Sequence, residues 1–135
     1  MTDVIAIIPA RSGSKSVLDK NIALLCGFPL LAYSIAAAKM SKNISRVLVS
    51  TDSEEYAEVA RKWGAEVPFI RPDKISTDMS ARKDVIKHAL DFFKRKNKLY
   101  DYIVYLEPTS PLTTETDIDT SIEKLLLDKN AESIV

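Results

Sequence analysis

Three short apolar runs mark this chain, at residues Val4–Pro9, Arg46–Ser50 and Tyr102–Leu106. Each is too short for a helix and lacks the strict alternation of a half-exposed strand. Continuous apolar runs of this length are typical of parallel strands buried on both faces. We therefore predict a buried parallel sheet with helices on both sides.

The stretches between these runs carry helical signals. Helices are predicted over residues 29–39, with Pro29 in the first turn, and over residues 53–64, which begin with Ser53 and two glutamates. Residues 80–98 form the longest predicted helix. Its apolar side chains recur every three or four residues and form one stripe, made of Val85, Ile86, Ala89, Leu90 and Phe93.

The remaining segments complete an α/β pattern. Residues 66–70 are predicted to be a short strand, and residues 117–127 a helix capped by Thr116. Strands alternating with helices predict a doubly wound, mostly parallel α/β sheet. Residues 131–135 look like the entrance to another strand, so we expect the chain to be C-terminally truncated.

Composition places the chain among ordinary globular proteins. Its 135 residues are 46% hydrophobic and 28% charged, which suits one domain spanning residues 1–135. The 19 basic residues balance the 19 acidic ones, so no global field attracts nucleic acid or a membrane.

The single cysteine, Cys26, excludes an internal disulfide and is expected to pack. Without a recognisable secretory leader, we expect a cytoplasmic protein.

The loop after the first strand has the composition of an anion-binding site. Backbone N–H groups and hydroxyls around Ser12, Gly13 and Ser14 can surround anionic oxygens, and Arg11 and Lys20 supply positive charge. The same loop could also be an ordinary solvated basic connection between a strand and a helix. The loop by itself leaves both interpretations open.

Three polar segments follow the three predicted strands. Residues 11–21 follow the first strand, Asp52 the second and residues 107–112 the third. In doubly wound sheets, ligands bind outside the carboxyl ends of the strands, where the strand order reverses. We therefore predict one site at this edge. For Asp52 we favour a helix-capping role over a catalytic one.

The motifs of this chain occur in the order of a known family. Residues 8–15 read Ile-Pro-Ala-Arg-Ser-Gly-Ser-Lys, and Lys20 and Asn21 follow five residues later. Residues 49–52 read Val-Ser-Thr-Asp and residues 107–112 read Glu-Pro-Thr-Ser-Pro-Leu. Together these motifs resemble the CMP-sialic acid synthetases, or acylneuraminate cytidylyltransferases. The resemblance covers nearly the whole chain.

The resemblance implies a Rossmann-like nucleotidyltransferase fold and the transfer of a cytidylyl group from CTP to a 2-keto sugar acid. It implies that Arg11 and Lys20 are catalytic through contact with the triphosphate, because such transfer depends on positioned positive charge. The other residues implied to bind the nucleotide are Ala10, Ser12, Gly13, Ser14, Asn21, Arg71 and Ser80. An isolated arginine in the place of Arg71 would otherwise be read as a surface ion pair with Asp73.

The resemblance assigns Glu107, Thr109 and Ser110 to the sugar, on a loop stiffened by two prolines. Many relatives have glutamine where this chain has Glu107. A carboxylate accepts hydrogen bonds but cannot donate them as an amide can. This difference points to a variant nonulosonic acid, such as legionaminic or pseudaminic acid.

The family also implies Mg²⁺ and a homodimer, although its magnesium-binding aspartates and its dimerisation arm lie beyond residue 135. No residue of this chain is therefore assigned to a metal, and no general base is identified. Two alternatives stay open: a catalytically silent nucleotide-binding fragment, and an enzyme like the CMP-Kdo synthetases. The three glycines cannot form the Gly-x-Gly-x-x-Gly motif of a dinucleotide-dependent oxidoreductase. His88, the only histidine, is expected to pack or to lie at the surface rather than to catalyse or to bind a metal.

Overall fold

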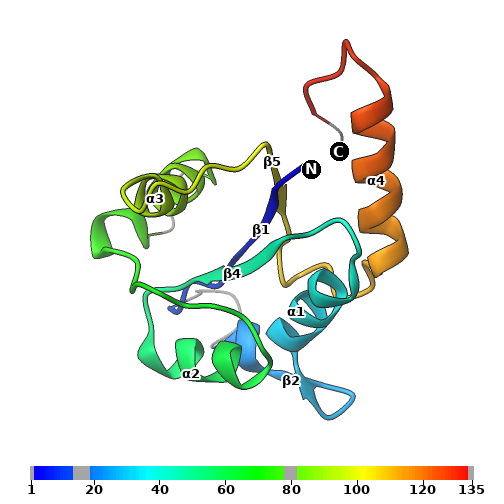
Figure 1. Cartoon of the computed structure of the whole chain (residues 1–135). Helices are drawn as coiled ribbons and strands as arrows, with labels where there is room; N and C mark the ends of the chain where they lie inside the picture. The colour runs from blue at the N-terminus through cyan, green and yellow to red at the C-terminus, as the bar shows by residue number, and fades with distance from the viewer. Residues whose placement is uncertain (1, 14–18, 78–81, 134–135) are drawn as a thin grey trace.

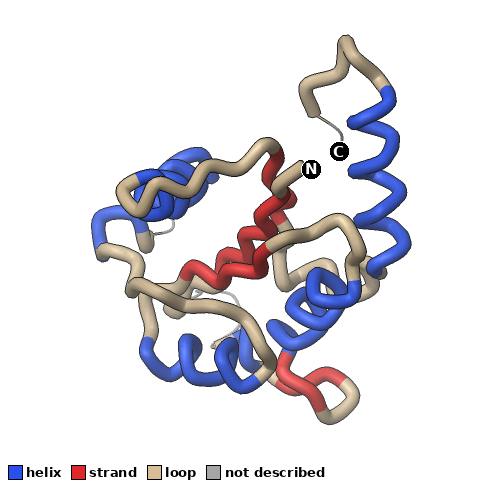
Figure 2. Tube along the Cα trace, in the orientation of Figure 1, coloured by secondary structure: helices blue, strands red, loops and turns tan. Residues whose placement is uncertain are grey.

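The computed structural model describes residues 2–13, 19–77 and 82–133. At its centre is a parallel sheet of three strands in the order β4-β1-β5. Strand β1 (Val4–Pro9) lies between β4 (Arg46–Ser50) and β5 (Tyr102–Tyr105), as Figure 2 shows. The first five residues of β1 are fully buried, which explains why its sequence is apolar without alternation. The three strands predicted from the apolar runs are confirmed, with β5 one residue shorter than expected.

Helices cover both faces of this sheet (Figure 1). Helices α1 (Leu30–Met40) and α2 (Glu54–Lys62) pack on one face, and α3 (Arg82–Lys94) packs on the other. The alternate residues of β1 divide between the two cores: Ala6 and Ile8 face α1 and α2, whereas Ile5 and Ile7 face α3. The doubly wound α/β fold is therefore confirmed.

The strand order reverses at β1. The chain passes from β1 through α1 to β4 on one side, and then returns through α3 to β5 on the other side. The predicted strand over residues 66–70 would extend the sheet beyond β4, but it is wrong in extent. Only Glu66 forms a bridge, with Leu48, because Pro68 cannot donate a backbone hydrogen bond to a continuing ladder.

The boundaries of α3 and α4 differ from the prediction for identifiable reasons. Helix α4 (Glu115–Leu127) begins after Thr114, whose hydroxyl accepts a hydrogen bond from the backbone N–H of Asp117, so the expected cap at Thr116 is wrong. Helix α3 ends at Lys94 rather than at residue 98, and Asn97 then adopts a left-handed φ of 61°. Residues 131–133 are not in a strand, and residues 134–135 lie outside the described part.

A small hairpin precedes α1. Its strands are β2 (Leu24–Leu25) and β3 (Phe28–Pro29), and its two turn residues, Cys26 and Gly27, have φ angles of 53° and 87°. Cys26 is exposed, so the predicted packing role is wrong. Pro29 directly precedes the first residue of α1. Among the described residues, no helix is both long enough and apolar enough to cross a membrane.

Candidate active site at the carboxyl edge of the sheet

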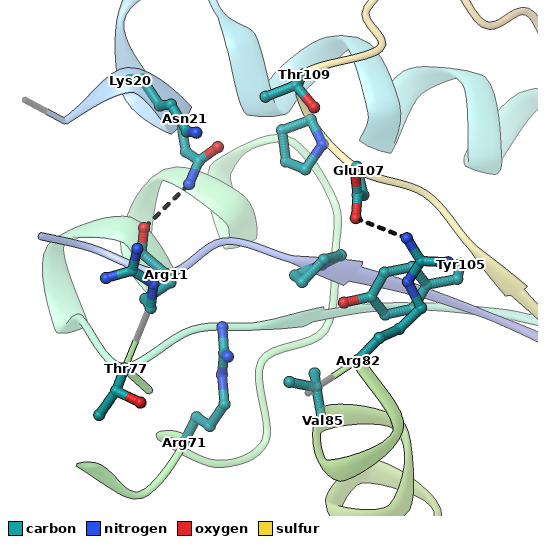
Figure 3. Close-up of a pocket in the computed structure, with 12 residues that line it drawn as sticks. Arg11, Lys20, Asn21, Arg71, Thr77, Arg82, Val85, Tyr105, Glu107 and Thr109 are labelled. Atoms are coloured by element: carbon teal, nitrogen blue, oxygen red, sulfur yellow. Dashed lines mark hydrogen bonds and ion pairs between the residues drawn. The ribbon is translucent and has the colours of Figure 1, made fainter. Parts of the chain in front are cut away.

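A cavity of about 370 Å³ opens where β1 and β5 end. Four separate segments line it: the end of β1 with the loop after it, the segment between α2 and α3, the start of α3, and the end of β5 with the segment after it (Figure 3). Four of its described lining residues are cations, namely Arg11, Lys20, Arg71 and Arg82. The chain has no net charge, so this cluster is a local positive site at the place predicted for it.

The lining divides into two sides. Figure 3 shows Arg11, Lys20, Asn21 and Arg71 together, away from β5, and we call them the loop side. Arg82, Tyr105 and Glu107 lie together at the other end, and we call them the β5 side. The loop side brings together four of the residues predicted to bind the nucleotide.

Asp52 fixes the beginning of the loop after β1. Its carboxylate accepts hydrogen bonds from the backbone N–H of Ser12, at 2.8 Å, and from the Ser12 hydroxyl, at 2.9 Å. The helix-capping role that we favoured for Asp52 is wrong, because the Ser53 hydroxyl caps α2 by accepting from the N–H of Tyr56. Both donors of Ser12 are thus paired with Asp52, and its predicted nucleotide contact stays a prediction.

Tyr56 fixes the other end of the same loop. Its hydroxyl, on the buried face of α2, donates a hydrogen bond of 2.7 Å to the Asp19 carboxylate. Burial and the nearby Asp19 raise the pKa of Tyr56 above its usual range, so the phenol keeps its proton at neutral pH. Asp19 has a left-handed φ of 52°. Its bond to Tyr56 therefore holds the chain in a restricted conformation next to Lys20.

The loop presents Arg11 and Lys20 to the cavity. The side chain of buried Asn21 donates to the backbone carbonyl of Arg11 at 3.1 Å, which ties the two edges of the loop together. The Arg11 guanidinium donates to the carbonyls of Ser12 and Gly13 at 3.2 and 3.3 Å. Lys20 begins the 3₁₀ helix η1 (Lys20–Ile22), and its ammonium group pairs with none of the described residues. A phosphate can therefore reach Lys20 without displacing a described partner.

Arg71 is buried at the end of β4, with only 3% of its surface exposed. Its guanidinium donates to the backbone carbonyls of Ser50 and Ile75 at 3.0 and 3.1 Å. The alternative of an exposed ion pair with Asp73 does not fit this burial. Burial lowers the pKa of Arg71, and the negative charge of Asp52 partly offsets that effect.

One donor of Arg71 is left over. Its Nε is buried and has no hydrogen-bond partner among the described residues. A buried donor of this kind is usually satisfied by water or by a ligand, because leaving it unpaired costs roughly 1–3 kcal/mol. Since Arg71 lines the cavity, this donor supports ligand binding on the loop side.

The β5 side is built around an ion pair. Nη2 of Arg82 lies 3.2 Å from a carboxylate oxygen of Glu107, and its Cζ lies 4.9 Å from the centre of the Tyr105 ring. Burial raises the pKa of Tyr105, and the charge of Glu107 adds to this effect. Sequence reasoning missed Arg82 and Tyr105. Tyr105 lies within the predicted strand over residues 102–106, so its sequence context indicates a strand residue and not a site residue. Arg82 resembles any exposed cation on a helix.

A second cavity of about 210 Å³ lies beyond this ion pair and shares Arg82, Tyr105 and Glu107 with the first. Ser110 lines this second cavity, whereas Thr109 lines the first. The predicted sugar-binding residues are therefore divided between two neighbouring hollows. Ala10 is fully buried and lines neither of them.

The other predicted residues lie near this edge or outside the described part. Gly13 is exposed, with a φ of 69° that favours glycine. Ser14 and Ser80 belong to residues 14–18 and 78–81, outside the described residues. The centre of the His88 ring lies 4.5 Å from the centre of the Phe69 ring, and the two rings meet edge-on. This contact agrees with the predicted packing role of His88.

Known proteins resemble this chain over most of its length. The family model described as "Cytidylyltransferase" matches residues 5–134. This chain belongs to the cytidylyltransferase family. The resemblance to the CMP-sialic acid synthetases that we inferred from the motifs is confirmed by relatives within this family.

Two curated cytidylyltransferases illustrate the similarity. The chain is 42% identical over 122 residues to the N-acylneuraminate cytidylyltransferase of Escherichia coli O18:K1:H7, covering 90% of this chain and 28% of that protein. It is 38% identical over 122 residues to the pseudaminic acid cytidylyltransferase of Campylobacter jejuni, covering 90% of this chain and 53% of the relative. The chain thus spans about half or less of these relatives.

A solved structure supports the fold. The CMP:2-keto-3-deoxy-manno-octonic acid synthetase complexed with CTP superimposes with a TM-score of 0.79, at 18% sequence identity. The match covers 96% of this chain and 49% of that structure. At this level of identity the similarity concerns the arrangement of strands and helices.

The described residues of this chain do not by themselves form a site that would hold a magnesium ion. They contain no group of three or more histidine, cysteine, aspartate or glutamate side chains placed to hold a metal. Glu107, the carboxylate among the described lining residues, is paired with Arg82.

Proposed function

We propose that this chain is the nucleotide-binding, N-terminal portion of a cytidylyltransferase that activates a nonulosonic acid. The reaction converts CTP and an acylneuraminate-type acid into the CMP-sugar and pyrophosphate. One observation carries the proposal: the cations of the loop side converge on a single cavity at the switch point of the sheet, in a member of this family.

The bond changes define what the cavity must do. The anomeric hydroxyl oxygen of the sugar bonds to the α-phosphorus of CTP, the bond from that phosphorus to the bridging oxygen breaks with its electron pair going to the departing pyrophosphate, and the hydroxyl proton passes to water. Negative charge grows on the phosphoryl oxygens and on the departing pyrophosphate. Arg11 and Lys20 would stabilise this charge, and Arg71, held by backbone carbonyls, would fix the nucleotide.

The acceptor is proposed to lie at Glu107, Thr109 and Ser110. Their carboxylate and hydroxyl groups suit a polyhydroxylated sugar, and the second cavity beside them offers additional room. The two curated relatives are named for different acids, so the choice among neuraminic, legionaminic and pseudaminic acids is open to experiment. Magnesium dependence, a cytoplasmic location and homodimer formation are further proposals from the family resemblance.

The direct test combines binding with turnover. CTP is titrated into the chain by calorimetry, and pyrophosphate release is measured with CTP, Mg²⁺ and one of four acids: N-acetylneuraminic, legionaminic, pseudaminic or Kdo acid. We expect CTP binding, and release with a nonulosonic acid. Binding without release would identify a nucleotide-binding fragment, release with Kdo alone would change the substrate, and absence of both would refute the proposal.

Substitutions locate the nucleotide. Arg11→Ala and Lys20→Ala should each weaken CTP binding about tenfold or more, because a charge-assisted hydrogen bond contributes about 1.5–3 kcal/mol. Lys62→Ala is the matched control, since it removes an exposed cation from α2 outside the cavity. If Lys20→Ala bound CTP as tightly as Lys62→Ala does, Lys20 would have no role in the mechanism.

A further inference from the structure

The ion pair of Arg82 and Glu107 occupies the boundary between the two cavities. Both side chains, together with Tyr105, line the 370 Å³ cavity and the 210 Å³ cavity. The side chains of Arg82 and Glu107 remain 65% and 49% exposed. An exposed pair of this kind typically contributes only about 0–1 kcal/mol to stability. A ligand can therefore separate the two partners at low cost.

Charge determines which ligand suits this boundary. The carboxylate of Glu107 repels phosphate groups, whereas the cations of the loop side attract them, so the triphosphate is favoured away from β5 (Figure 3). Arg82 is the exception on the β5 side: it is a cation that Glu107 already neutralises and that stacks on the Tyr105 ring. Because Arg82 is paired with Glu107, it is poorly placed to bind a second polyanion beside the nucleotide.

A polyhydroxylated carboxylic acid fits both members of the pair. Its hydroxyl groups can donate to Glu107, which has no donor of its own when ionised, and its carboxylate can accept from the guanidinium of Arg82. The planar guanidinium can contact a carboxylate with two parallel hydrogen bonds. The second cavity, lined by the hydroxyl-bearing residues Ser34, Ser110 and Thr113, offers polar groups to the rest of such an acid.

We infer that Arg82 is a specificity-determining residue, which binds the carboxylate of the acceptor sugar acid while Glu107 accepts hydrogen bonds from its hydroxyl groups. This inference rests on the proposed function. It adds a residue that the sequence motifs do not include, and it assigns the acceptor's negative charge to the start of α3. Arg82 thereby distinguishes an acid from a neutral sugar of the same shape.

The test changes the ligand and the residue together. N-acetylneuraminic, legionaminic and pseudaminic acids are titrated into the chain after it has been saturated with CDP in the presence of Mg²⁺. CDP is used in place of CTP so that the loop side is occupied while no CTP is present for turnover. The acid that binds most tightly is then compared with its methyl ester, which lacks the negative charge. We expect the wild type to prefer the acid about tenfold, as for one charge-assisted contact.

Arg82→Ala should bind the acid and the ester alike, while its CTP affinity stays within about twofold of the wild type. Lys87→Ala, which removes an exposed cation from the same helix away from both cavities, should keep the preference for the acid. Thermal unfolding of each variant checks that the fold is retained.

Several results would overturn the inference. If Arg82→Ala still preferred the acid over the ester, the carboxylate of the acceptor would not bind Arg82. A wild type that binds acid and ester equally would lead to the same conclusion. CTP binding in a wild-type chain that binds none of the three acids would refute the inference and leave the nucleotide site intact. A chain that does not bind CTP would refute the proposed function itself, and the inference with it.

Discussion

The two sides of the cavity hold their charged residues in opposite ways. On the loop side, Arg71 is 3% exposed and fixed by backbone carbonyls, and the loop that carries Arg11 is tied to Asp52. On the β5 side, Arg82 is 65% exposed and is held by one ion pair and one aromatic ring. Under the proposed function, the polyanionic nucleotide, which is the same in every reaction, meets fixed charges, whereas the variable acceptor acid meets an ion pair that can open.

Removal of Asp52 should break the loop side most strongly. Asp52→Ala leaves the N–H and hydroxyl of Ser12 without their acceptor and removes a charge that raises the pKa of Arg71. We expect the free energy of unfolding to fall by about 1–3 kcal/mol and CTP affinity to fall about tenfold. Chemical denaturation and calorimetry measure the two effects.

The control for Asp52 is Glu58→Ala, which removes an exposed carboxylate from α2. It should change neither quantity measurably, because surface substitutions usually stay within about 0.5 kcal/mol. If Asp52→Ala kept both the stability and the CTP affinity of this control, the rigid loop side would not depend on the link between Ser12 and Asp52.

Tyr56→Phe should have a smaller effect at the other end of the loop. It removes only the hydroxyl that donates to Asp19 and leaves the buried ring in the core. We expect a loss of about 1 kcal/mol in stability and a threefold weaker CTP affinity. Tyr33→Phe is the matched control, since its hydroxyl donates to the carbonyl of Leu25 in the hairpin. Equal CTP affinities in the two variants would show that the hydrogen bond between Tyr56 and Asp19 has no role in nucleotide binding.

Glu107→Gln should produce the smallest change in nucleotide binding and should sharpen the comparison. Loss of the carboxylate frees Arg82 and makes the cavity more positive, so CTP affinity should rise about twofold at low salt and less at high salt. Glu123→Gln breaks another exposed ion pair, with Lys42 at 3.3 Å, and should leave CTP affinity unchanged. A weaker CTP affinity in Glu107→Gln would place the nucleotide against Glu107 instead.

Hydrophobic pattern predicted the framework of the molecule closely. The limits of β1 and β4 coincide with the predicted runs at residues 4–9 and 46–50, because a strand buried on both faces is apolar nearly throughout; in β4 only the end residues Arg46 and Ser50 are polar. The apolar stripe of α3 also faces the sheet, with Val85, Ala89 and Phe93 buried. These features depend on short-range periodicity, which a sequence displays directly.

The failures have local causes that periodicity does not contain. Thr114 and Thr116 are both acceptable caps, and only the backbone conformation at Thr114 selects it for α4. Residues 66–70 have the composition of a strand, but Pro68 limits their pairing to the bridge at Glu66. Cys26 is apolar in character, yet the hairpin turn places it in solvent.

The sequence by itself determined the doubly wound sheet, the family and the loop side of the site. Buried strands and motif order can be read directly along the chain, and parallel strands necessarily bring their carboxyl ends to one edge. Only the tertiary structure decided that Arg82 and Tyr105 join Glu107 on the β5 side. Arg82 and Glu107 are 25 residues apart and meet because α3 packs across the sheet face opposite α1. Contacts of this kind depend on how helices pack, and no motif in either segment records them.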